Sequence, residues 1–260
     1  MLRASMLGTT TVLASILVVA GAQARTTKPV VPKNVSAAVA DSSRPDADKA
    51  RDAERKPAAC LAFAGLRPGE SVIELAPGKG YYTRLLSLSV GPTGKLLVIA
   101  SPRRPDAAAD APAPSAPIHA IADDAHYGNI TVSEQRALEL SLPADSADLV
   151  WTSQNYHDFH NVKDLDVVSL DKKIFEALKP GGVFLVIDHV AEAGSGFRDT
   201  NTLHRVDPEA VKKEVESAGF KYEGESDVLR NKDDPHTAKV FDPSIQGHTD
   251  QFVFKFRKPK

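Results

Sequence analysis

Short apolar runs alternate with amphipathic stretches along most of the chain. Residues 71–75 form an apolar run of the length of a buried strand. Residues 81–88 then carry leucines on one side, as a helix would, and Gly91-Pro92-Thr93-Gly94 ends that helix. Residues 95–100 form a second apolar run. A strand, a helix and a strand in this order predict parallel pairing with a right-handed crossover.

The same alternation continues toward the C-terminal end. Residues 164–178 carry apolar side chains at helical spacing, and residues 179–182 are typical of a helix end. Asp207-Pro208-Glu209 is typical of a helix start, and Gly219 of its end. Further strands are expected at 129–133, 147–151, 183–187, 224–229 and 251–257. These elements predict an α/β fold, a doubly wound, mostly parallel seven-stranded sheet with a C-terminal antiparallel hairpin.

The N-terminal end follows a different pattern. Arg3 precedes an apolar run at 12–20, and Ala22-Gln23-Ala24 has the pattern of a cleavage site. Residues 1–24 are therefore predicted to be a signal peptide, which implies an exported, periplasmic protein. The apolar run is shorter than the roughly 20 residues that a membrane span needs, so we expect no stable span after cleavage. A short uncleaved anchor is the alternative.

The rest of the chain is expected to contain one folded domain. Residues 25–45 are rich in Pro, Ala, Ser and Thr and predict a flexible linker. The domain then covers residues 46–260, with a helix from Asp46 that is interrupted before Pro57. An Ala/Pro/Asp-rich stretch at 101–117 predicts a surface insertion.

Charge and cysteine content narrow the function classes. The net charge is −2, and loss of Arg3 with the signal peptide would make it −3. Such a chain offers no broad positive surface for nucleic acid, so no nucleic-acid partner is expected. The single cysteine, Cys60, cannot form an internal disulfide and lies in an apolar segment typical of a buried thiol.

A glycine-containing loop, Glu74-Leu75-Ala76-Pro77-Gly78-Lys79-Gly80, lies between the first strand and its helix. Small residues let a backbone approach a ligand, and a helix N-terminus presents free N–H groups. Open α/β sheets bind ligands at the carboxyl ends of their strands, where this loop falls. The loop therefore indicates a ligand site, with a tight turn that binds nothing as the alternative.

The stretch from Leu66 through this loop resembles the first motif of class I S-adenosylmethionine-dependent methyltransferases. Leu142-Pro143 with residues 148–150, and then Leu178-Lys179-Pro180-Gly181-Gly182, match later motifs at the usual separations. The match covers about residues 46–260. Within the superfamily the chain resembles an exported bacterial group with a tyrosine pair, an Asn-Tyr-His-Asp segment and a Leu-His-Arg segment. The resemblance implies methyl transfer from S-adenosylmethionine to a small or exposed nucleophilic acceptor.

The resemblance also implies a set of cofactor contacts. Glu74, Gly78 and Gly80 would surround the amino acid portion of the cofactor. The complete set is Glu74, Ala76, Pro77, Gly78, Gly80, Tyr81, Ser101, Ala137, Asn155 and Tyr156. Three positions depart from the common pattern. Ala76 replaces the first glycine, Ser101 stands near the place of the acidic residue that accepts the ribose hydroxyls, and Ala137 near that of the acidic residue that meets the adenine amine.

Histidines and aspartates follow the fourth and fifth strands, at the edge of the sheet where the loop lies. The candidate catalytic residues are His157, Asp158, Asp188, His189 and His204. For methyl transfer, His157 or His189 would take a proton from the acceptor, and Asp158 or Asp188 would orient the base.

Two other function classes remain open for these residues. Imidazole and carboxylate groups are also metal ligands, so a metal-dependent enzyme is one alternative. No pair has the i, i+4 spacing of a zinc-binding helix, and we assign no metal ligands. The other alternative is an exported module that binds a nucleoside-like or other small ligand. A purely structural role, such as a turn cap for Asp188 or a backbone hydrogen bond for His204, is the fourth interpretation. Fold similarity alone does not choose the chemistry.

Overall fold

The computed structural model describes residue 1, residues 30–103, 106–108 and 110–260. The predicted signal peptide, apart from Met1, and residues 25–29 of the predicted linker lie outside these residues. Within the part of the chain that the structure describes, no helix is long and apolar enough to cross a membrane.

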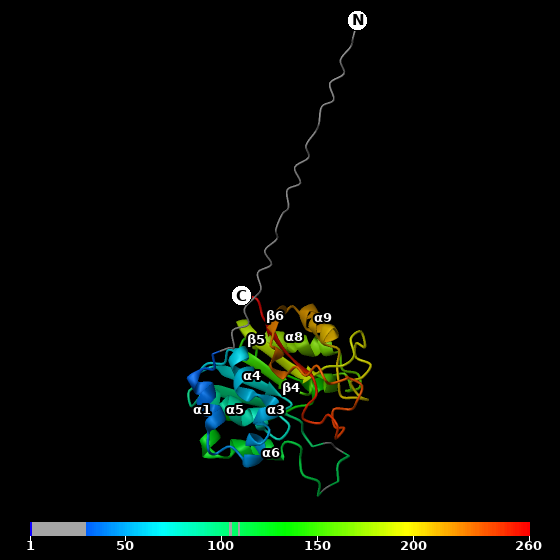
Figure 1. Ribbon diagram of the computed structural model, residues 1–260. Coiled ribbons are helices and arrows are strands. Elements are labelled where there is room, and N and C mark those ends of the chain that lie inside the picture. The colour runs from blue at the N-terminus through cyan, green and yellow to red at the C-terminus, as the bar shows by residue number, and fades with distance from the viewer. Residues whose placement is uncertain (2–29, 104–105, 109) are drawn as a thin grey trace.

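One seven-stranded sheet forms the centre of the domain (Figure 1). Its strands are β1 (Ser71–Leu75), β2 (Lys95–Ala100), β3 (Ile130–Glu134), β4 (Ala147–Ser153), β5 (Leu178–His189), β6 (Lys221–Glu225) and β7 (Gln251–Arg257). They lie in the order β3-β2-β1-β4-β5-β7-β6, with β1 to β5 parallel and β7 antiparallel to both of its neighbours. The predicted α/β class, the mostly parallel sheet and the antiparallel C-terminal hairpin are confirmed.

Two strands differ in extent from the prediction. β5 begins at Leu178, five residues before the expected strand, because Leu178 already pairs with Ala147 ahead of a register shift. β6 ends at Glu225, and residues 227–229 form a short 3-10 turn, η3 (Asp227–Leu229). The side chain of Ser226 accepts a hydrogen bond from Val228 N, which caps that turn and ends the strand.

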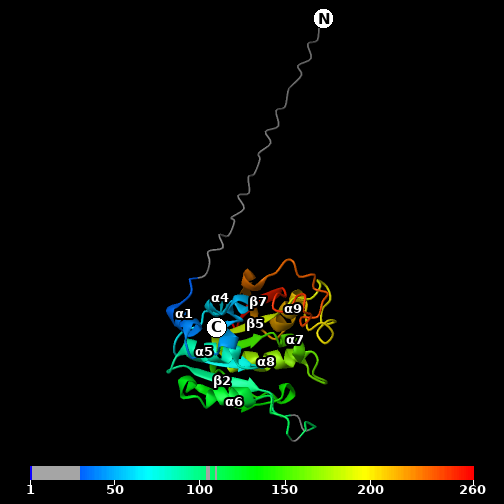
Figure 2. The same ribbon diagram turned by 60° about the horizontal axis from the view of Figure 1, so that its bottom comes forward.

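Helices cover both faces of the sheet (Figures 1 and 2). One face carries α1 (Lys33–Ala40), α4 (Pro57–Ala64), α5 (Tyr81–Val90) and α6 (Ala116–Ala122), and the other carries α7 (Tyr156–Phe159), α8 (Val167–Ala177) and α9 (Pro208–Ser217). The remaining short pieces are α2 (Asp46–Lys49), α3 (Asp52–Arg55), η1 (Ala125–Tyr127) and η2 (Ala137–Glu139). Each face has its own core because alternate strand residues point in opposite directions. On β4, Leu149 and Trp151 enter the first core, whereas Val150 enters the second.

The segment before residue 46 differs from the predicted linker. Residues 33–40 form helix α1, whose Val35 is fully buried against α4 and α5. The Asn34 amide donates to the carbonyl of Ser89 at the end of α5 (2.9 Å). Arg44 is also buried and pairs with Asp52 (2.7 Å). The burial of Val35 and the contacts of Asn34 and Arg44 show that this segment belongs to the packed domain.

The helical stretch from Asp46 is broken where the sequence predicts. α3 ends at Arg55, and Lys56 adopts a left-handed φ of 42° before Pro57 opens α4. Cys60 on α4 lies in the first core, as expected, and burial raises the pKa of its thiol to about 12. This break places α3 at the carboxyl edge of the sheet, where it lines the main cavity.

Candidate functional site

A cavity of about 620 Å3 lies at the carboxyl ends of β1 and β4, beside the glycine-containing loop. Its size is typical of a small-molecule site. The lining includes most of the predicted cofactor contacts, namely Glu74, Ala76, Pro77, Gly78, Tyr81, Ser101 and Asn155. We call it the main cavity. Asp158 also lines it, so the predicted loop and one of the candidate catalytic residues share one space.

The loop owes its shape to three left-handed residues. Ala76 has φ 48°, Gly78 φ 59° and Gly80 φ 84°. The left-handed conformation disfavours a side chain by about 1 kcal/mol or more, so Ala76 is strained where a glycine would not be. The Asn155 amide donates to the carbonyl of Ala76 (2.9 Å) and fixes the loop to the segment after β4.

The two glycines of the loop serve different purposes. A Cβ on Gly78 would meet no atom within 4 Å, and Gly78 lines the main cavity. A Cβ on Gly80 would lie 2.2 Å from the Ile121 side chain of α6, and Gly80 does not line the cavity. The missing side chain of Gly80 makes room for α6, and the prediction that Gly80 contacts the cofactor remains a prediction.

Glu74 is a buried carboxyl group at the floor of the main cavity. It is 2 % exposed, and its Oε2 accepts a hydrogen bond from the Thr83 hydroxyl (2.6 Å). Burial raises the pKa of Glu74 to about 8. The carboxyl group therefore carries a proton at neutral pH unless a cation lies against it.

Arg55 at the end of α3 is a partly buried cation that forms no ion pair with a described carboxylate. Its guanidinium lies over the rings of Tyr81 (4.7 Å) and Tyr82 (5.5 Å) and donates to the side chain of Gln154. Burial lowers its pKa, its Nε has no hydrogen-bond partner, and none of the described carboxylates forms an ion pair with it. A partly desolvated cation without an ion-pair partner attracts negative charge, so this geometry favours an anionic ligand. Arg55 lies among the charged residues of 51–56, so the sequence alone does not distinguish it as a functional residue.

A second cavity of about 430 Å3 adjoins the main one and shares Arg51, Arg55 and Gln154 with it. His189, at the end of β5, lines this second cavity, and its Nδ1 lies 2.7 Å from the Thr249 hydroxyl. Burial lowers the pKa of His189 to about 4, so its imidazole is neutral at pH 7. The two cavities together offer adjoining spaces for two ligands.

The candidate catalytic residues come together at the ends of β4 and β5. Asp188 is fully buried, and its carboxylate accepts hydrogen bonds from His157 Nδ1 (2.8 Å) and from the His157 and His189 backbone N–H groups (each 2.8 Å). His157 Nε2 lies 3.3 Å from Asp158 Oδ1 and 3.3 Å from His204 Nδ1. Each of the five predicted residues therefore contacts another member of the set.

Opposing effects act on the buried His157–Asp188 pair. Burial alone would lower the pKa of His157, but the charge of Asp188 and their hydrogen bond outweigh it and raise that pKa. Burial alone would raise the pKa of Asp188, but the charge of His157 and its hydrogen bonds hold it below the usual value. Asp188 therefore stays ionised and orients His157.

Two further predicted cofactor contacts, besides Gly80, lie outside the main cavity. Tyr156 is fully buried in the second core, and its hydroxyl contacts Asp171 and Glu214 (each 2.8 Å). The single turn of α7 directs Tyr156 into the core, while Asn155 and Asp158 face the cavity. Ala137 lines a smaller apolar recess that shares Ala76 and Ser101 with the main cavity.

Comparison with known proteins identifies the architecture. No family model matches the chain, and no curated protein matches its sequence. Among solved structures, an S-adenosylmethionine-dependent methyltransferase from Aquifex aeolicus is 17% identical with a TM-score of 0.53, over 82% of this chain and 98% of that one. Another from Mesorhizobium loti is 18% identical with a TM-score of 0.56, over 80% and 99%.

The chain has the methyltransferase fold. The [4+2]-cyclase SpnF also matches, at 18% identity and a TM-score of 0.58, over 82% of this chain and 81% of that one. A cyclase among proteins of the methyltransferase fold illustrates that the fold alone does not determine the reaction.

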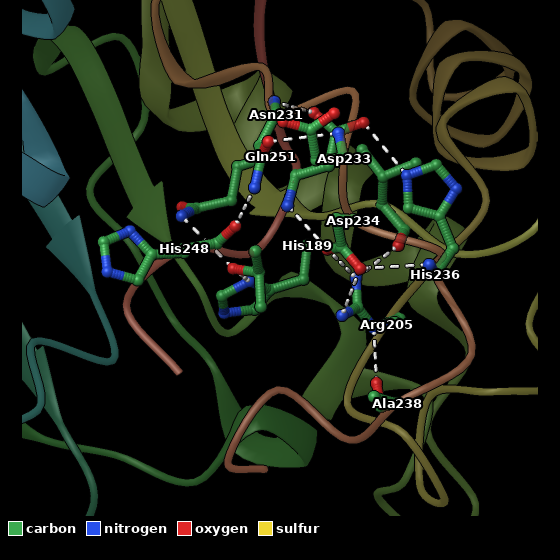
Figure 3. A network of polar contacts seen from close by, with 12 residues as sticks. His189, Arg205, Asn231, Asp233, Asp234, His236, Ala238, His248 and Gln251 are labelled. Atoms are coloured by element: carbon green, nitrogen blue, oxygen red, sulfur yellow. Dashed lines mark hydrogen bonds and ion pairs between the residues drawn. The ribbon is translucent and has the colours of Figure 1, made fainter. Parts of the chain in front are cut away.

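A buried polar network supports the methyltransferase fold beside the second cavity (Figure 3). Arg205 is fully buried and pairs with Asp234 (2.8 Å), and its guanidinium also donates to the carbonyls of Val190 (2.9 Å) and Ala238 (2.8 Å). Asp234 in turn accepts a hydrogen bond from the Asp250 backbone N–H (2.7 Å). Residues 234–250 are thereby held against the end of β5, where His189 lies.

Proposed function

We propose that the protein is an exported, periplasmic methyltransferase that uses S-adenosylmethionine and acts on a small or exposed nucleophilic acceptor. Residues 1–24 would be its signal peptide, and no nucleic-acid partner is proposed. The observation that carries the proposal is the unpaired guanidinium of Arg55 at the main cavity, opposite the glycine-containing loop of a methyltransferase fold.

The charged groups of the main cavity fit the amino acid portion of this cofactor. The carboxylate of the cofactor would pair with Arg55, whose Nε has no hydrogen-bond partner among the described residues. The ammonium group would meet Glu74, which would then give up its proton. Both groups line the same cavity, so one ligand could satisfy them together.

The rest of the cavity fits a nucleoside, with differences from the common pattern at Ser101 and Ala137. The small apolar recess lined by Ala137, Leu140 and Ile99 would take one edge of a planar base. The ribose hydroxyls would meet the hydroxyl of Ser101 at the end of β2 instead of a carboxylate. We therefore expect S-adenosylmethionine to bind with modest affinity.

When bound, the cofactor supplies a methyl group on a positively charged sulfur. The second cavity would hold the acceptor, because it adjoins the main cavity through Arg55 and Gln154. His189 is neutral at pH 7, and in the tautomer whose Nδ1–H donates to the Thr249 hydroxyl, its Nε2 can accept a proton from an acceptor hydroxyl or amine. Asp188 fixes the backbone of His189 through its N–H group.

Calorimetric titration of the protein with S-adenosylmethionine tests the proposal. We expect the unmodified protein to bind and Arg55→Met to bind roughly 10- to 150-fold more weakly, the cost of losing a hydrogen-bonded ion pair. Because Arg55 has no carboxylate partner in the described part of the chain, the variant should keep its thermal stability. Arg67→Met, which removes an exposed arginine elsewhere, is the matched control. Absence of binding by the unmodified protein, or equal binding by Arg55→Met, would contradict the proposal.

Proton release gives an independent check on Glu74. Its pKa of about 8 means that the free carboxyl group is protonated at pH 6.5, whereas an ammonium group bound against it favours the ionised form. The α-amino group of the ligand stays protonated at this pH. Binding should therefore release about one proton and tighten as the pH rises toward 8. Titrations in two buffers of different ionisation enthalpy measure the release, and Glu74→Gln should abolish it. Identical heats in both buffers would show that Glu74 does not ionise on binding.

A further inference from the structure

We infer that His157, Asp158 and His204 form a binding site for one divalent transition-metal ion of the zinc class. The three side chains come from two segments, the turn of α7 and the loop that precedes α9. One potential ligand atom from each lies within 4.8 Å of the others. Metal binding here requires neither a methyl donor nor an acceptor, so its test is separate from that of methyl transfer.

The distances among the ligand atoms match tetrahedral coordination. His157 Nε2 lies 3.3 Å from Asp158 Oδ1 and 3.3 Å from His204 Nδ1, and the last two atoms are 3.6 Å apart. Bonds of 2.0–2.1 Å from a tetrahedral zinc ion separate its ligand atoms by about 3.3 Å. Hydrogen bonds between such atoms are usually shorter, at about 2.9 Å. All three separations are therefore compatible with one central ion.

Asp188 orients the His157 ring for metal binding. Its buried carboxylate accepts a hydrogen bond from His157 Nδ1 (2.8 Å) and another from the His157 backbone N–H (2.8 Å). With its proton on Nδ1, the ring directs the lone pair of Nε2 toward Asp158 and His204. A carboxylate that orients a histidine from behind in this way is the usual outer partner of a metal ligand.

The neighbouring His189 does not belong to the site. Its Nδ1 contacts the Thr249 hydroxyl (2.7 Å), and its ring centroid lies 6.2 Å from that of His157. His189 faces the second cavity, whereas Asp158 lines the main one. The metal ligands are thus a subset of the histidines and aspartates at this edge of the sheet, and His189 provides a control close by.

Three protein ligands would leave one position of a tetrahedral ion open. Catalytic zinc sites have this composition, with a water or substrate oxygen as the fourth ligand. Asp158 is half exposed, with 54 % of its side chain accessible, and it lines the main cavity, so a ligand from that side could reach the ion. The fourth ligand would be a water molecule, whose pKa the ion would lower.

Cobalt and zinc titrations test the site. The chelator-treated protein should bind one Co2+ per chain with the intense visible absorption of tetrahedral cobalt, and Zn2+ should displace it. His204→Ala and Asp158→Ala should each abolish the absorption. Both side chains are partly exposed, so circular dichroism should show that the variants remain folded. Asp188→Asn should weaken zinc binding by roughly 10- to 100-fold without changing the stoichiometry.

His189→Ala is the matched control and should bind cobalt as the unmodified protein does. Two outcomes overturn the inference: no tetrahedral cobalt absorption in the unmodified protein, or absorption that persists in both His204→Ala and Asp158→Ala. If zinc binds and S-adenosylmethionine does not, the metal site stands and the methyltransferase proposal fails. If S-adenosylmethionine binds and zinc does not, the methyltransferase proposal stands and the metal site is rejected.

Discussion

Replacing Arg205 with methionine should lower the free energy of unfolding by about 3–5 kcal/mol. The side chain is fully buried, and its guanidinium is bound by Asp234 and by two backbone carbonyls. Methionine keeps much of the volume but leaves the Asp234 carboxylate buried without its counter-charge. Urea denaturation followed by circular dichroism measures the loss.

An exposed arginine provides the control for this change. Arg198 forms ion pairs with Glu192 and Asp199, but 60 % of its side chain is exposed to solvent. Arg198→Met should cost less than about 1 kcal/mol, because surface ion pairs contribute little. A similar small cost for Arg205→Met would mean that the network is not what holds residues 234–250 against β5.

The second large effect is expected from valine substitutions at the two loop glycines. Both positions have left-handed backbones, so valine at either should cost about 1–2 kcal/mol of stability. Valine at Gly80 must also displace Ile121 and Ile118 of α6, which adds about 1–3 kcal/mol. Gly80→Val should therefore be clearly less stable than Gly78→Val in urea denaturation.

Ligand binding should rank the same two variants in the opposite order. Gly78 lines the main cavity, and a side chain there would occupy the space beside the loop. Gly78→Val should reduce S-adenosylmethionine binding more than Gly80→Val does, when each is titrated under conditions where it is folded. Equal stability of the two variants would refute the assignment of Gly80 to the packing of α6.

The sequence predicts those features that depend on local patterns. Apolar runs, glycines and prolines mark the strands and helix ends, and the resulting sheet is confirmed. The convergence of His157 with Asp188 also follows from the pattern, because parallel strands β4 and β5 end at the same edge. Their separation of 2.8 Å is the consequence of that topology.

The remaining features depend on packing between distant segments, which no local pattern records. Arg55 matters because the described carboxylates do not reach it, and that absence has no signature in the sequence. Tyr156 and His157 are adjacent residues with opposite surroundings, and a one-turn helix is too short for its periodicity to distinguish them. Helix α1 likewise has only eight residues, too few for its periodicity to stand out before its contact with α5 is known.

The reactivity of Cys60 can report when the N-terminal helices, which carry Arg55, open. It is the only cysteine in the chain, it is fully buried on α4, and its Sγ lies 3.6 Å from the carbonyl of Arg55. Since burial raises the pKa of this thiol to about 12, alkylating reagents should react only when the N-terminal helices open. The labelling rate therefore measures how often these helices detach from the sheet. A ligand that bridges Arg55 and the loop would slow labelling without touching the sulfur.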